Sequence, residues 1–454
     1  MSDLITVSLG LASFHVTSQP HFETNRQGNK VTVTDGEIEG GLPERCHLCG
    51  GPMDRHDSHT TVIQTIPIML RVHLLRVTVR RKRCRDCGHV ESQEIPFKAE
   101  GHRITDLLRR VLEHELSDGC TVKALAWRYM VHPSIVKAID KERLRRAYEG
   151  RRPGPCMYLG VDEFLLHRGH RYATEFINLQ TGEVLWCCEG KDKSAVDRFI
   201  AYVGEKWMRK VQVVAMDMNA QYDSAFRENP ASAHVRIGYD FFHLVKLGND
   251  SMISRLRKRM QRELRDSGDE QGYRLLKSCR FVVLSSRETI LRKDLAAHQW
   301  NKRLSGLVFA GALPKNTRMA REDRGLRLEK LLRKNNGLYT CYVLVEQLKA
   351  AFKSDGPRNA DAVRARFRDW LRLARQSGIE EALAFADTVE RHLEGIINAI
   401  RYGVSTGILE GTNNMIKTIR RQAYGFRDTQ YFFYKIYECS RRPYRFWVSH
   451  KILL

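Results

Sequence analysis

Several features that mark secreted and membrane proteins are missing from this sequence. No stretch of the 454 residues approaches the roughly 20 consecutive apolar residues that a membrane-spanning helix needs. The N-terminal segment lacks the basic start and apolar core of a secretory signal. Internal repeats and low-complexity segments are also missing. We therefore expect a cytoplasmic protein with no membrane partner.

Acidic residues are in deficit. Asp and Glu together number 53 against 76 for Lys and Arg, which gives a formal net charge of +23. A soluble protein with such an excess of positive charge is expected to bind a polyanion, because basic side chains that neutralise its phosphates release the counterions condensed on it. Nucleic acid is the favoured partner, and an anionic membrane surface is the weaker alternative. The length exceeds what one compact core requires and predicts two or three domains in a multidomain α+β protein.

The cysteines do not form the evenly spread set of a disulfide framework. Four of the 11 lie in two CxxC pairs, and the other seven are scattered. A glycine follows each pair, Gly50 and Gly88, as a tight metal-binding turn requires. We predict a tail or short hairpin over residues 1–40 and a structural zinc ribbon over 41–100, because four thiolates suit tetrahedral zinc. The alternative is four unrelated buried thiols. The predicted zinc ligands are Cys46, Cys49, Cys84 and Cys87.

Residues 101–150 change to helical periodicity and predict three short helices. Thr121 can cap the second helix, and the turn at His132 and Pro133 separates it from a third helix rich in Lys and Arg. This order is typical of a helix-turn-helix DNA-binding domain. A plain three-helix bundle is the alternative. The predicted phosphate-contacting residues are Lys137, Lys141, Arg143, Arg145 and Arg146.

Residues 151–250 read as strands with helices between the later ones. Three neighbouring strands, a helix, a strand, a helix and a strand are the order of a ribonuclease-H-like mixed sheet. Asp162 ends the first strand, and Asp217 ends the apolar run Val211–Met216. Two carboxylates at the tips of adjacent strands suit hard divalent cations that bridge a scissile phosphate. Taken singly, each acid could equally be a loop or capping residue.

The remainder combines a helical insertion over 251–400 with a final part of the core over 401–454. One run inside the insertion, Phe281–Leu284, looks more like a strand. Glu410 begins a helical pattern that places amide and cationic groups on one face, as metal binding beside a DNA backbone requires. A solvated helix face is the alternative. The residues on this face are Asn413, Asn414, Lys417, Arg420 and Arg421, and a basic tail follows at Arg441, Arg442 and Arg445.

Four separated blocks of the sequence carry a resemblance. They are GVDEF around Asp162, AMDM around Asp217, DFFHLVKL from Asp240 and LEGTNNMIKTIRRQAYGF from Leu409. In this order they resemble the bacterial insertion-sequence transposases of the ISL-three family, over nearly the whole chain. The chain departs from the family at Ser405 and Thr406, where a Ser-Asn pair is common, so an amide contact near the DNA is in doubt.

The resemblance implies a ribonuclease-H-like core interrupted by the helical insertion. It implies a catalytic triad of Asp162, Asp217 and Glu410 that holds Mg²⁺ or Mn²⁺. Asp240 competes with Asp217 for the second metal position, and otherwise Asp240 and His243 support the site or contact DNA. The expected substrates are double-stranded transposon ends and target DNA, handled by a homodimer in the bacterial cytoplasm at the nucleoid.

Two other functions fit the same residues. A DNA-binding regulator would keep the zinc ribbon and helix-turn-helix above a core without catalysis. A structure-specific nuclease or resolvase would cleave DNA without joining ends. Metal-dependent cleavage separates the first from a transposase, and strand transfer separates the second.

Overall fold

A computed structural model describes residues 9–441, apart from 12, 26, 27, 69, 168–170, 279, 353–358, 405 and 406. Arg442 and Arg445 of the basic tail, and the Ser405–Thr406 departure, lie outside the described residues. The chain divides into two compact units: residues 1–151 with 415–454, and residues 152–414.

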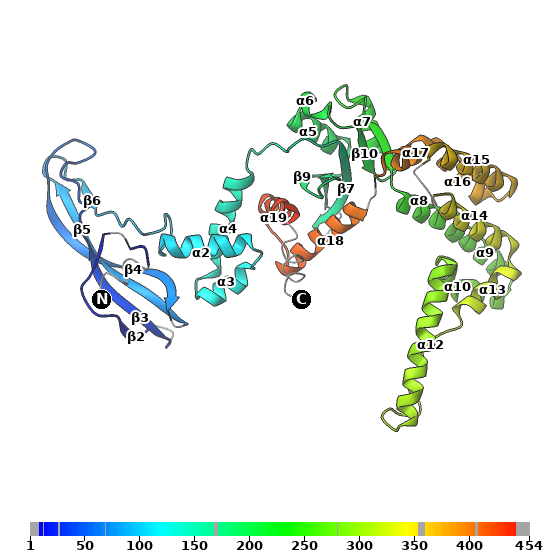
Figure 1. Ribbon diagram of the computed structural model, residues 1–454, viewed down its shortest axis with the longest axis horizontal. Helices are drawn as coiled ribbons and strands as arrows, with labels where there is room; N and C mark the ends of the chain where they lie inside the picture. Colours follow the sequence, from blue (N-terminus) through cyan, green and yellow to red (C-terminus); the bar gives the residue numbers. More distant parts are fainter. Residues whose placement is uncertain are drawn as a thin grey trace. The chain divides into compact units, whose positions relative to one another are not determined.

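The first unit opens with a six-stranded sheet (Figure 1) in which β1, β3, β5 and β4 are neighbours in that order. β2 pairs with β3, and β6 with β5. β2 and β3 form an antiparallel hairpin, as the short-hairpin alternative predicted for this region. The hairpin is not isolated, because β3 also pairs with β1 and, in parallel, with β5. The bounds are β1 Phe14–Val16, β2 His21–Thr24, β3 Lys30–Ile38, β4 Met53–Ile68, β5 Arg71–Cys84 and β6 Val90–Ser92.

Three helices follow in the same unit: α2 (Asp106–Ser117), α3 (Val122–Tyr129) and α4 (Pro133–Tyr148). The side chain of Thr105 caps α2, and that of Thr121 caps α3, each by accepting a backbone N–H. Leucines of α2 pack with residues of α3 and α4 in a small core. The three predicted helices are present, and the C-terminal helix α19 (Thr429–Arg441) packs against α4.

The second unit contains a five-stranded sheet with the order β11-β10-β7-β8-β9. β7, β8 and β9 are antiparallel neighbours, while β10 lies parallel to both β7 and β11. Along the chain, three strands, helices, a strand, a helix and a strand follow one another, in the predicted order. The bounds are β7 Tyr158–His167, β8 Arg171–Asn178, β9 Val184–Glu189, α5 Lys193–Val203, α6 Glu205–Met208, β10 Val213–Met216, α7 Ala220–Glu228 and β11 Arg236–Tyr239.

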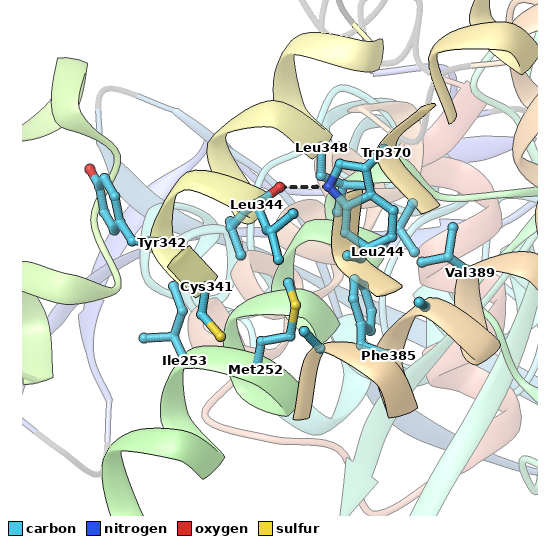
Figure 2. Packing of buried hydrophobic residues seen from close by; sticks show 14 of the residues in the cluster. Leu244, Met252, Ile253, Cys341, Tyr342, Leu344, Leu348, Trp370, Phe385 and Val389 are labelled. Atoms are coloured by element: carbon cyan, nitrogen blue, oxygen red, sulfur yellow. Dashed lines mark hydrogen bonds between the residues drawn. The ribbon is translucent and has the colours of Figure 1, made fainter. Parts of the chain in front are cut away.

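Helices occupy the remainder of the second unit. Their apolar faces form a separate core, shown in Figure 2, in which the indole N–H of Trp370 donates to the carbonyl of Leu344 at 2.7 Å. The run Phe281–Leu284, which looked strand-like in the sequence, falls mostly in helix α11, and Val283 is buried among the helices of this core. The bounds are α8 Phe241–Gly248, η1 (a π-helix) Asn249–Ser254, α9 Arg255–Asp266, α10 Glu270–Ser278, α11 Arg280–Val283, α12 Arg287–Phe309, α13 Arg324–Lys334, α14 Asn336–Phe352, α15 Ala360–Gln376, α16 Glu380–Arg391, α17 Leu393–Tyr402 and α18 Gly407–Gln422.

Candidate active site

Strand register places acidic residues from neighbouring strands in one row across the second sheet. Asp162 lies within β7 and not at its end as predicted, because β7 stays paired with β8 as far as His167. Asp162 is the direct partner of Glu175 of β8. Ala215 of β10 is the partner of Gly160, so two residues further on Asp217 falls beside Asp162. Because partners in a sheet point to the same face, the carboxyl groups of Asp217, Asp162 and Glu175 share one face.

Asp162 is the most enclosed of the predicted triad. Its Oδ2 accepts a hydrogen bond from Asn413 Nδ2 at 2.7 Å, and its Oδ1 accepts one from the backbone N–H of Glu163 at 2.7 Å. Burial, and after it the negative charge of Asp217, raise the pKa of Asp162 to about 6. A carboxylate that is costly to ionise alone is stabilised by a cation, so this environment favours a bound positive charge.

Asp217 and Asp240 both contact His243. The ring Nδ1 of His243 lies 2.7 Å from Asp217 Oδ1 and 2.6 Å from Asp240 Oδ2. Hydrogen bonding to Asp217, and then to Asp240, raises the pKa of His243 to about 10. Oxygens of Asp217 and Asp240 and a ring nitrogen of His243 lie within 4.8 Å of one another, so this group could also hold a metal ion.

The two aspartates differ in what else they hold. Asp240 Oδ1 accepts the backbone N–H of Phe242 at 2.8 Å and so caps α8, while its other oxygen faces His243. The side chain of Asp240 is only 6% exposed, whereas that of Asp217 is 37% exposed. Asp217 is therefore the more available of the two to a ligand from solvent.

Glu410 lies in the first turn of α18. The helix approaches the sheet at Gly160, where an added Cβ would come within 2.7 Å of Leu409. One turn after Glu410, Asn413 donates to Asp162. Glu410 itself is exposed and is in none of the described groups of clustered metal-binding side chains. The structure thus brings the start of α18 to Asp162 without placing the Glu410 carboxylate in a formed metal cluster.

A cavity of about 300 Å³ opens at this site. Asp162 and Asp217 line it together with Glu163, Tyr222, His243 and Lys246. The hydroxyl groups of Tyr222 and Thr174 lie 2.7 Å apart, a contact that fixes the tyrosine. A small space walled by carboxylates and reached from solvent suits a hydrated cation and a phosphate group.

Glu175 belongs to the row of acidic residues across the second sheet, and it was not predicted from the sequence. It is fully buried, and both of its side-chain oxygens lack a hydrogen-bond partner. Burial and the neighbouring Asp162 hold its pKa well above the usual value. A buried carboxyl group without a partner is either neutral or neutralised by a cation nearby, so it fits a metal centre at Asp162. The signal in the sequence was a single acid within the apolar strand Ala173–Ile177.

The four predicted zinc ligands do come together in the first unit. Cys46 Sγ lies 3.7 Å from Cys87 Sγ, and Cys49 Sγ lies 3.4 Å from Cys84 Sγ. Each of the two CxxC turns, here called knuckles, closes on a glycine with positive φ, Gly50 at 73° and Gly88 at 70°. Hydrogen bonding, first of all from the backbone at Cys87, lowers the pKa of Cys84 to about 7. Four thiols in this arrangement could hold zinc.

The cations predicted to contact DNA from α4 are mostly engaged within the protein. Arg143 pairs with Asp140 and Glu438 and is only 15% exposed. The other pairs are Lys141 with Asp428, Arg145 with Glu142 and Glu149, and Arg146 with Glu113. Lys137 forms no ion pair with a described carboxylate. On α18, Asn414, Lys417 and Arg421 are exposed, and Arg420 is half-buried. Their role in DNA contact stays a prediction.

Comparison with known proteins decides the family. A family model described as a transposase, of the DDE type named ISL3, matches residues 159–436. The transposase of insertion sequence element IS1001 from Bordetella parapertussis is 30% identical over 392 residues, covering 86% of this chain and 87% of that protein. The chain belongs to the ISL3 family of transposases. The resemblance of the four sequence blocks is thereby confirmed.

A second relative of this transposase is more distant. The transposase of IS1557 from Mycobacterium tuberculosis (strain CDC 1551 / Oshkosh) is 25% identical over 318 residues, covering 68% of this chain and 65% of that protein. The family match spans the sheet that carries Asp162 and Asp217, the helical region and Glu410. Among the described residues, no helix is both long and apolar enough to cross a membrane.

Proposed function

We propose that this transposase binds the terminal inverted repeats of an insertion sequence and catalyses metal-dependent DNA cleavage and strand transfer. The observation that carries the proposal is that Asp162 and Asp217 line one cavity and that Asn413, on the helix that bears Glu410, donates to Asp162. The family match, over residues 159–436, includes all three acids.

Each residue has a distinct role in this proposal. Asp162 and Asp217 would hold the divalent Mg²⁺ or Mn²⁺ ions, and Glu410 would complete the set of ligands. Asn413 keeps the Asp162 carboxylate oriented through its 2.7 Å hydrogen bond. The bound cations supply activation of water and stabilisation of the attacking and leaving oxygens.

The chemistry consists of two phosphoryl transfers on DNA. Water attacks the phosphodiester at the end of the element, the bond to the 3′-oxygen breaks, and a 3′-hydroxyl is released. That hydroxyl then attacks a phosphodiester of target DNA, forms the new bond and releases a target 3′-hydroxyl. In each step one P–O bond forms and one breaks, so no covalent intermediate with the enzyme is needed.

Asp217 is favoured over Asp240 as the second ligand by the contacts of each. Asp240 uses one oxygen to cap α8 and the other on His243, and it is buried. We assign Asp240 and His243 to positioning, with His243 fixing the orientation of Asp217. The two ends of an element must be handled together, so the acting species is proposed to be a homodimer on DNA, with zinc at the four cysteines keeping the first sheet's knuckles closed.

The decisive experiment is a cleavage and joining assay with the full chain, labelled transposon ends, a target duplex and Mg²⁺. Asp162→Ala, Asp217→Ala and Glu410→Ala are each expected to abolish cleavage while retaining binding to the ends. Pre-nicked ends that are joined to target distinguish a transposase from a nuclease or resolvase. Retention of cleavage by Asp162→Ala and Glu410→Ala would overturn the assignment, and binding without any cleavage by the native chain would leave a DNA-binding regulator.

A further inference from the structure

A second cavity, of about 500 Å³, lies wholly within the first unit. Its walls come from the starts of α3 and α4 on one side and from the segment between α18 and α19 on the other. No residue of the metal site contributes to it. The lining residues used below are Lys123, Lys137, Tyr424, Phe426, Arg427 and Tyr431.

Four cations line the cavity, and one of them, Lys435, pairs with Asp140 and Glu438. Within the described part of the chain, Lys123, Lys137 and Arg427 form no ion pair, in contrast to Arg143 and Arg145 of α4, which are held by acids. The one carboxylate in the lining, Asp428, is paired with Lys141, and the more distant charge of Lys137 also helps to lower its pKa. Positive charge that is not neutralised by acidic residues around this cavity favours an anionic ligand.

Aromatic rings form part of the same wall. Phe426 stacks on Phe432 with ring centroids 4.6 Å apart, and Lys137 Nζ lies 5.9 Å from the centre of the Tyr431 ring. Tyr424 is 93% exposed and has a φ of 54°, in the left-handed region that large side chains rarely adopt. An exposed ring held in a costly backbone conformation points to a contact outside the chain.

We propose that this cavity binds one unpaired nucleotide of the DNA substrate, with its base against the aromatic wall and its phosphates at Lys123, Lys137 and Arg427. Aromatic rings interleaved with cations are the recognition chemistry of single-stranded nucleic acid, since a base must leave its stack to meet a ring. The volume suits a nucleotide and is too small for a duplex. The inference rests on the proposed function, which makes DNA the substrate.

The position in the chain gives the site a use. The segment from Tyr424 to Arg427 directly follows the helix that bears Glu410, and the opposite wall belongs to the helix-turn-helix. A nucleotide freed from pairing when a DNA end is opened would thus be held between the segment that follows the Glu410 helix and the helices predicted to bind DNA.

The test compares full-length variants on two DNAs of the same sequence, one a blunt duplex and one with a short unpaired end carrying 2-aminopurine. Tyr424→Gly removes the ring and permits the positive φ. Lys137→Ala removes one unpaired cation, and Arg110→Ala, at a cation of α2 paired with Asp106, is the matched control. Binding is measured by fluorescence anisotropy across a salt series, and folding by thermal melting.

Tyr424→Gly is expected to weaken binding to the unpaired end about tenfold or more and to leave blunt-duplex binding unchanged. Lys137→Ala should lower the salt slope by about one for the unpaired end, while Arg110→Ala leaves it unchanged. 2-Aminopurine fluorescence should be quenched by the native chain and recovered in Tyr424→Gly. Equal loss on both DNAs, or native affinity for the unpaired end in both variants, overturns the inference.

Failure of this inference is distinguishable from failure of the proposed function. If the native chain cleaves and joins transposon ends while both cavity variants bind the unpaired end normally, only the nucleotide site is wrong. If the native chain binds DNA but cleaves none in Mg²⁺ or Mn²⁺, the proposed function fails and the nucleotide site loses its basis.

Discussion

Replacing Asp162 with Asn should make the metal-free protein more stable at pH 8. Asp162 has its pKa raised from 3.8 to about 6 by burial and by Asp217. Because this pKa is higher in the folded protein than in the unfolded chain, the free energy of unfolding keeps its full value below about pH 4 and falls as the pH rises through about 6. The pKa shift of about 2 units means that the ionised carboxylate costs the folded state about 3 kcal/mol, a cost that Asn removes. Asn accepts through a single oxygen, so one of the two hydrogen bonds is lost at a cost of about 1 kcal/mol. The net expected gain is about 2 kcal/mol above pH 7.

Hydrogen exchange is the appropriate assay, because the chain has two units and global unfolding need not be two-state. Exchange of peptides from β7 and β8 is compared in EDTA for the native chain and Asp162→Asn at pH 4.5 and pH 8. The gain should be largest at pH 8 and shrink toward pH 4.5, after correction for intrinsic exchange rates. Added Mn²⁺ should protect the native chain alone. An Asn variant that is less stable at pH 8, or equally changed at both pH values, would refute the reasoning.

Three further outcomes are expected. Chelation of zinc, or the substitution Cys49→Ser, should open the two CxxC turns and lower the melting temperature of the first unit, because a structural zinc site contributes folding energy. Proteolysis and calorimetry measure the change. If zinc analysis shows one bound ion in the native chain, an unchanged melting temperature after its removal would contradict this prediction. Arg143→Ala should lower the free energy of denaturant unfolding, since the buried Asp140 and Glu438 then share Lys435 as a remaining cationic partner. Lost DNA affinity at native stability would instead make Arg143 a DNA contact. Glu175→Gln should weaken Mn²⁺ binding by calorimetry about tenfold without lowering metal-free melting; native affinity would show that Glu175 does not assist the cation.

Local patterns in the sequence were enough for much of the architecture. The strands from β7 to β11 and the three helices from α2 to α4 follow from runs of apolar residues and from caps such as Thr121, which act over a few residues. The cysteine cluster follows from two short knuckles with their glycines. By contrast, β3 joins the first sheet through parallel pairing with β5, a contact between distant segments that local patterning does not encode.

By itself, the sequence determined the family, the order of elements and Asp217 at the end of a strand, whereas the strand that carries Asp162 continues beyond it to His167. Only the tertiary structure decided which groups act together. Register placed Glu175 beside Asp162, and the helix start brought Asn413 onto the same carboxylate. Packing of α19 on α4 turned Arg143 from an expected DNA contact into part of a buried ion-pair network. The physical reason is that burial and pairing depend on residues hundreds of positions apart, whereas propensity and spacing are read within one element.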